Sequence, residues 1–221
     1  MTAVLVGLFF IIGTVSGVLS MIFLGSFMED PEYLTSIAAN GNKVVIGVLC
    51  ILTMGFALTM VPVLLYPIFR KFNQTLAMGA VVFRGALEAV VYMAQAVLWL
   101  LLLSVSQGFS VAGSADVPVF QNIGALFISA DAWIAHILSI VFSLGALMIY
   151  WVFYRSKLIP RWLSIWGIVG GILYFAAPIA GLFDLDLGFL MLPLALQEMV
   201  LALWLIIKGF NPNAIASISE R

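Results

Sequence analysis

The chain has 221 residues, of which 64% are hydrophobic and only 9% are charged, and its formal net charge is −1. A water-soluble domain carries roughly 25% charged residues, so a chain with this composition would expose large apolar patches to water. The composition therefore excludes a soluble globule and predicts an integral membrane protein in contact with the lipid bilayer.

Other features of the composition exclude several classes of function. The chain has one cysteine, Cys50, and one histidine, His136, which excludes an internal disulfide, a CxxC site and a bis-histidine haem within the chain. It has no basic run with aromatic residues of the kind that binds nucleic acid, no Gly-x-Ser-x-Gly sequence and no glycine-rich phosphate loop. We therefore expect no catalytic residues, metal, cofactor or nucleic-acid partner, and an enzymatic activity is disfavoured.

Six apolar segments are long enough to cross a bilayer, which takes about 20 apolar residues in a helix. We expect helices because an open sheet edge does not survive in hydrocarbon. The expected spans are residues 3–28, 44–69, 76–106, 131–154, 162–182 and 187–207. Residues 107–130 begin polar and become apolar only after Pro118, so we expect an interfacial segment between the third and fourth spans. The predicted fold class is all-α: a bundle of six transmembrane helices in one integral membrane domain, residues 1–221.

The charged residues outside the spans separate by side of the membrane. Seven of the nine basic residues fall on one side: Arg70, Lys71, Arg155, Lys157, Arg161, Lys208 and Arg221. The other side has Lys43 and most of the acidic residues: Glu29, Asp30, Glu32, Asp116, Asp184 and Asp186. Basic residues in short loops stay in the cytoplasm. We therefore expect both termini to be cytoplasmic and the protein to be a multi-pass protein of the cell (plasma) membrane.

Small residues recur at four-residue spacing in the first and fifth spans, at Gly13 and Gly17 and at Gly167 and Gly171. Such pairs let two helix backbones approach closely. Two interpretations stay open: packing between helices of one chain, and contact between the copies of a homo-oligomer.

Three ionisable residues are expected near the middle of the membrane, where an unpaired charge costs at least about 2.5–3.5 kcal/mol. Arg84 lies roughly 13 Å below the cytoplasmic start of the third span, Glu88 lies one turn further along, and Glu198 lies roughly 16 Å into the sixth span. Because residues at i and i+4 share a helix face, Arg84 is predicted to bridge Glu88 and Glu198. We name these three residues the midplane cluster. It is a candidate binding or transport site for a small solute, an ion or a lipid; alternatively, it is a structural clasp in a scaffold or accessory protein.

Other polar residues in the spans are weaker candidates. His136 is either a proton-responsive group facing the same cavity as Glu88 or a hydrogen-bond donor between helices. Asp131 is expected at the N-terminal end of the fourth span, near the membrane interface, where the helix dipole favours a negative charge. Gln95 and Gln197 are expected to form hydrogen bonds between helices.

A basic cluster, Arg155, Lys157 and Arg161, lies beside Trp162 at the predicted cytoplasmic ends of the fourth and fifth spans. Clusters of this kind bind anionic lipid headgroups. The alternative is that these residues only set the topology and anchor the helix ends at the interface.

Three segments of the chain resemble a known family: residues 83–88 (FRGALE), 155–167 (RSKLIPRWLSIWG) and 197–210 (QEMVLALWLIIKGF). The resemblance is to a prokaryotic membrane family catalogued as domain of unknown function 4386, and it covers nearly the whole chain. It implies a protein with six membrane spans. It implies no activity, and no catalytic residue comes with it.

Overall fold

The computed structural model describes residues 1–28 and 30–219. Glu29 and Arg221 of the charge pattern, together with Glu220, lie outside the described residues. Within these ranges the chain is helical and has no strand. Six helices are long and apolar enough to cross a membrane, as the sequence predicts.

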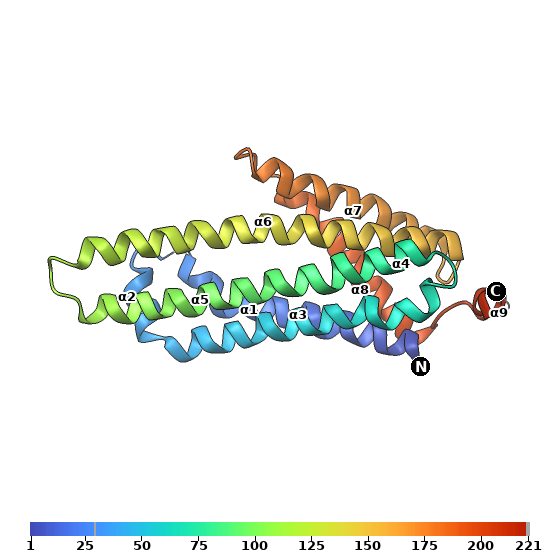
Figure 1. Ribbon diagram of the computed structural model, residues 1–221, viewed down its shortest axis with the longest axis horizontal. Helices are drawn as coiled ribbons and strands as arrows, with labels where there is room; N and C mark the ends of the chain where they lie inside the picture. Colours follow the sequence, from blue (N-terminus) through green and yellow to red (C-terminus); the bar gives the residue numbers. More distant parts are fainter. Residues whose placement is uncertain (29, 220–221) are drawn as a thin grey trace.

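The spans follow one another in an up-and-down bundle whose two termini lie at the same end (Figure 1). The spanning elements are α1 (Thr2–Met28), α3 (Gly41–Phe69), the continuous rod of α4 (Gln74–Ala80), η1 (Val81–Leu87) and α5 (Glu88–Val111), α6 (Val117–Ser156), α7 (Arg161–Gly181), and η2 (Gly188–Met191) with α8 (Leu192–Ile207). Two short helices lie at opposite ends of the bundle: α2 (Tyr33–Ala39), at the end predicted to face outward, and α9 (Pro212–Ser219), near the C-terminus.

Helix α1 packs along α3 and α8, while α6 packs against α5 and α7. Lipid tails are as apolar as the side chains, so close approach of the helices depends on small residues. Gly13 of α1 meets Leu58 of α3, and Gly167 of α7 meets Tyr150 of α6. Both small-residue pairs are therefore used for packing within the chain, which is the first of the two interpretations of that pattern.

The structure shows how residues 107–130, the expected interfacial segment, are folded. Helix α5 continues to Val111 and α6 begins at Val117, so this stretch is the tip of a helical hairpin. Helix α6 has 40 residues, a length of about 60 Å against a hydrocarbon thickness of about 30 Å. The hairpin of α5 and α6 consequently extends beyond the outer end of α7 (Figure 1). The helix boundaries expected from the sequence were too short because they limited each helix to the thickness of the membrane, whereas α5 and α6 are longer and pack against each other.

Candidate functional site

The structure brings the three residues of the midplane cluster together. Arg84 donates from Nη1 to both carboxylate oxygens of Glu88, at 2.7 and 2.9 Å, and from Nη2 to Oε1 of Glu198 at 3.1 Å. The side chains of Arg84 and Glu88 are each 1% exposed and that of Glu198 is 12% exposed. The guanidinium carbon also lies 4.0 Å from the ring centroid of Phe142 on α6. The predicted bridge between the third and sixth spans is therefore present.

The backbone around Arg84 departs from the regular α-helix. Arg84 lies in η1, a seven-residue π-helical segment, a conformation that is rare and often found at functional sites. The neighbouring helices approach this segment closely: a Cβ on Gly145 of α6 would lie 2.5 Å from the backbone nitrogen of Arg84. From the other side, the Thr59 hydroxyl of α3 donates to the carbonyl oxygen of Gly85 at 3.3 Å. Helices α3 and α6 thus hold η1 where Arg84 points into the bundle.

The hydrogen bonds of the cluster are incomplete. Among the described residues, Nε of Arg84 is buried and has no partner. Glu198 uses Oε1 twice, since that atom also accepts from the Tyr150 hydroxyl at 3.4 Å. No described residue donates to its Oε2, which is not among the buried atoms lacking a partner and therefore borders open space. One arginine between two carboxylates leaves one negative charge uncompensated when all three groups are ionised, which a low-dielectric interior disfavours.

A cavity of about 160 Å³ adjoins the cluster, and we name it the midplane cavity. It lies between α1, α3, η1, α5, α6, α7 and α8, and its polar lining comes from Thr14, Arg84, Tyr92, Ser139, Tyr174 and Glu198. A volume of this size holds several water molecules or a small solute. The cluster therefore borders a space in which a ligand or water can meet Arg84 and Glu198.

Asp131 lies elsewhere than the sequence predicts, because α6 begins at Val117 and not near the aspartate. It is 7% exposed and lies well inside the helix. Its Oδ1 accepts hydrogen bonds from Nε2 of Gln95, at 3.0 Å, and from Nε1 of Trp99, at 3.1 Å, both on α5. The dipole of the helix N-terminus is therefore not what holds this carboxylate. In the sequence, the i, i+4 spacing of Gln95 and Trp99 indicates that both side chains lie on one face of the third span. This spacing identifies them as partners of Asp131 only when α6 is known to extend alongside them.

A second cavity, of about 310 Å³, lies beside Asp131, and we name it the outer cavity. Three residues, Met54, Tyr92 and Leu138, line both cavities. The two cavities therefore share part of their lining; one lies beside Asp131 and the other beside the midplane cluster.

His136 does not join the midplane cluster. Its ring lies against Gly181 of α7 and 6.1 Å from the ring of Trp133. It lines neither cavity, and within residues 1–28 and 30–219 it forms no hydrogen bond. Gln95 and Gln197 do link helices as expected, since Gln197 donates to the carbonyl oxygen of Leu163 on α7 at 3.0 Å.

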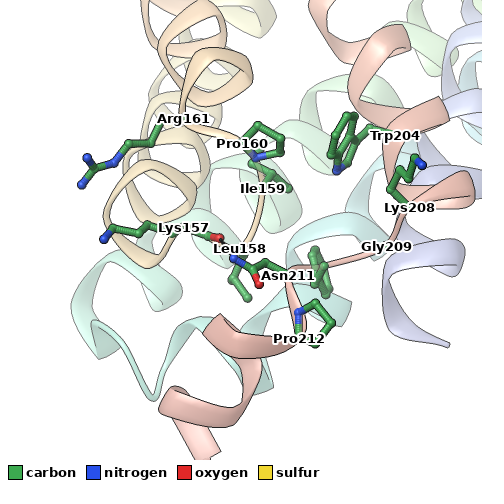
Figure 2. Close-up of a pocket in the computed structure, with 11 residues that line it drawn as sticks. Lys157, Leu158, Ile159, Pro160, Arg161, Trp204, Lys208, Gly209, Asn211 and Pro212 are labelled. Carbon is green, nitrogen blue, oxygen red and sulfur yellow. Dashed lines mark hydrogen bonds between the residues drawn. The ribbon is translucent and has the colours of Figure 1, made fainter.

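The basic cluster lies next to a groove of about 480 Å³ between the α6–α7 loop and the connection from α8 to α9. Figure 2 shows that the side chains of Lys157 and Arg161 extend away from this groove. The Arg161 guanidinium lies over the ring of Tyr154, at 5.4 Å, and Arg155 is exposed. The ring of Trp162 lies 6.4 Å from that of Trp204. These residues therefore form an outward-facing surface, and the groove itself is mainly apolar.

Comparison with known proteins identifies the family of the chain. No curated protein and no solved structure matches it. Residues 5–209 match the family described as "Domain of unknown function (DUF4386)". The matched range contains the midplane cluster, Asp131 beside the outer cavity, and the loop between α6 and α7. Since the match extends over nearly the whole chain, this six-span membrane protein belongs to the DUF4386 family.

Proposed function

We propose that the protein binds, and passes across the plasma membrane, a small solute or ion, and that its binding site is the midplane cavity with Arg84, Glu88 and Glu198. The observation that carries the proposal is the cavity of about 160 Å³ that borders Arg84 and Glu198 in the middle of the bundle. Ionisable groups in such a position are expensive, and they mark ion and substrate pathways in membrane proteins.

The competing function is a scaffold or accessory protein in which the cluster only clasps η1 to α8. A clasp is most stable when it is dry and when every polar atom has a partner. Here Nε of Arg84 has no partner among the described residues, and Oε2 of Glu198 borders open space. The open lining favours the binding site over the clasp.

Access to the midplane cavity is tested by cysteine labelling in proteoliposomes. The native Cys50 is replaced by alanine, and Ser139→Cys, which lines the cavity, is compared with Ser143→Cys, one turn further along α6 and fully buried. The reagent is a membrane-impermeant, positively charged methanethiosulfonate. We expect Ser139→Cys to react and Ser143→Cys to remain unmodified. Equal protection of both positions would mean that the cavity is closed and would favour the clasp.

Ligand-dependent chemistry at the cluster is tested by infrared difference spectroscopy. Spectra are recorded while the pH is changed, and again while Na⁺ is added at constant pH. We expect a carboxyl band that changes with one of these conditions and that is absent in Glu198→Gln. If wild-type protein and Glu198→Gln give the same difference spectra, the carboxylate takes no part in binding a proton or Na⁺.

We infer secondly that the basic cluster contacts anionic lipid headgroups at the cytoplasmic surface. The inference is supported by the outward direction of Lys157 and Arg161. In native mass spectrometry, Lys157→Gln/Arg161→Gln should retain less phosphatidylglycerol than the wild type and the same amount of phosphatidylcholine. The matched control, Arg70→Gln/Lys71→Gln, removes two charges from the other cytoplasmic loop. An equal loss of bound phosphatidylglycerol in both double variants would mean that the lipid responds to the total positive charge of the cytoplasmic loops and not to the basic cluster.

A further inference from the structure

We propose that the outer cavity around Asp131 is a binding site for organic cations, namely amines or quaternary ammonium ions with a compact apolar or aromatic body, and that it leads them to the midplane cluster. The proposal names the ligand class of the same pathway and in that respect rests on the proposed function. Four features of the outer cavity carry it: its open carboxylate oxygen, its lack of a counter-ion, its lining and its connection to Glu198.

The first feature is the geometry of Asp131. Both hydrogen bonds to this side chain, from Gln95 and Trp99, reach Oδ1. No described residue donates to Oδ2, and this atom is not among the buried atoms that lack a partner. Since Asp131 lines the outer cavity, we infer that Oδ2 is the oxygen that faces its open space. The two donors hold the carboxylate in place and leave one oxygen for a ligand.

The second feature is charge. Both ion pairs found in the described part of the chain use Arg84, so neither neutralises Asp131. Lys43, the basic residue on the outer side, donates to the Ser26 hydroxyl at 2.9 Å and lies over the ring of Phe27. A carboxylate that is 7% exposed and has no cation beside it is costly to keep ionised. A cationic ligand at Oδ2 supplies the missing charge.

The third feature is the lining of the cavity. Its volume of about 310 Å³ is in the range of small-molecule sites, which begins at about 300 Å³. Trp99 and Tyr92 provide aromatic faces, which attract cations. Met21, Met28 and Met54 provide flexible thioethers, which adapt to ligands of different shape. Carboxylate, aromatic and methionine side chains together favour a cation with an apolar body over a hydrated metal ion.

The fourth feature is the connection to the midplane cluster. Asp131 lies 11 residues before Phe142, the residue that stacks on Arg84, which is about 17 Å along α6. Glu198 resembles Asp131 in having one carboxylate oxygen that borders a cavity. Because Tyr92 and Leu138 line both cavities, we infer that a cation passes between these two side chains from one carboxylate to the next.

The proposal is tested by isothermal titration of the purified full-length protein with benzyltrimethylammonium, whose charge is fixed. Asp131→Asn keeps an acceptor for Gln95 and Trp99 and removes the charge; Asp186→Asn makes the same change at an exposed outer loop. We expect wild type and Asp186→Asn to bind equally and Asp131→Asn to bind about thirtyfold more weakly, the usual consequence of removing one partner of a buried charge pair. Absence of binding to the wild type, or equal binding to Asp131→Asn, would overturn the proposal.

A second measurement leaves Asp131 in place, so it does not depend on the folding of that variant. Ser20 lines the outer cavity and is 7% exposed. In the Cys50→Ala background, benzyltrimethylammonium should slow the labelling of Ser20→Cys, whereas its neutral isostere neopentylbenzene should not. Equal effects of the two compounds would refute a site selective for cations. If the two compounds have equal effects and Ser139→Cys is still labelled, only the ligand class is wrong and the midplane site stands. If they have equal effects and Ser139→Cys is protected from the reagent, the proposed function fails as well.

Discussion

Replacing Arg84 with glutamine removes the only positive charge of the midplane cluster while Glu88 and Glu198 stay in place. The substitution deletes three hydrogen bonds, two to Glu88 and one to Glu198. It also removes the cation that lies 4.0 Å from the ring centroid of Phe142. Breaking a buried ion pair by removing one partner costs about 3–5 kcal/mol, because the remaining charge is left uncompensated. For a chain of this length, that loss lowers the melting temperature by about 6–20 °C.

The assay is thermal unfolding of the purified protein in detergent, followed by circular dichroism. Arg155→Gln makes the same chemical change at an exposed arginine and should leave the melting temperature unchanged. A triple variant, Arg84→Met/Glu88→Gln/Glu198→Gln, removes every charge of the cluster. We expect it to recover most of the lost stability, because replacing a whole buried ion cluster with neutral side chains of similar size is often neutral or stabilising.

Two results would refute this reasoning. If Arg84→Gln melts at the same temperature as Arg155→Gln, the hydrogen bonds of Arg84 contribute nothing measurable to the fold. If the triple variant is no more stable than Arg84→Gln, the loss comes from the shape of the arginine side chain, and the uncompensated carboxylates are not its cause.

Three further predictions concern residues around the site. Gly145→Ala should lower the free energy of unfolding by about 1–3 kcal/mol, the usual cost of overpacking. Gly25→Ala should not, because a Cβ there would meet no described residue within 4 Å apart from its own helix; thermal unfolding checks both. Trp99→Phe removes a hydrogen bond to the buried aspartate of α6 and should cost about 1.5–3 kcal/mol in the same assay. The Ser36 hydroxyl, with the backbone N–H of Glu32, donates to Asp30 and holds the pKa of its carboxylate below the ordinary value. The stabilisation that these hydrogen bonds give is present at neutral pH and is lost as the pH falls through the lowered pKa. Ser36→Ala should therefore raise the pKa of Asp30, which an NMR titration measures.

The fold was predictable from hydropathy and charge because both follow directly from the bilayer. Apolar length predicts the spans, and the sorting of basic residues agrees with the two termini lying at one end of the bundle. The ends of α5 and α6 were not predictable in the same way. Residues 107–130 begin polar, which predicts a break between the spans, and only tertiary contact decides between a separate segment and the extended hairpin that the structure has.

The candidate site was predictable in part. Arg84 and Glu88 share a helix face, and the cost of an isolated arginine in the membrane pointed to Glu198 as a further partner. The π-helical segment left no signal, since residues 81–87 read as an ordinary apolar helix. The cavities depend on the shapes of side chains from several helices, which a pattern along one chain does not contain. Asp131 was misplaced because its partners are on another helix.

The number of carboxylates separates the two interpretations of the midplane cluster. A clasp between η1 and α8 needs Arg84 and Glu198 alone, since their hydrogen bond joins the two helices. Glu88 lies one turn from Arg84 on the same rod and accepts the hydrogen bonds of its Nη1. Among the described residues, these hydrogen bonds add no link to another helix. Its charge makes the cluster negative when all three groups are ionised, which weakens a purely structural clasp. A site for a proton or a cation requires this surplus of negative charge. Asp131, on the outer cavity, adds a further carboxylate toward the outer side.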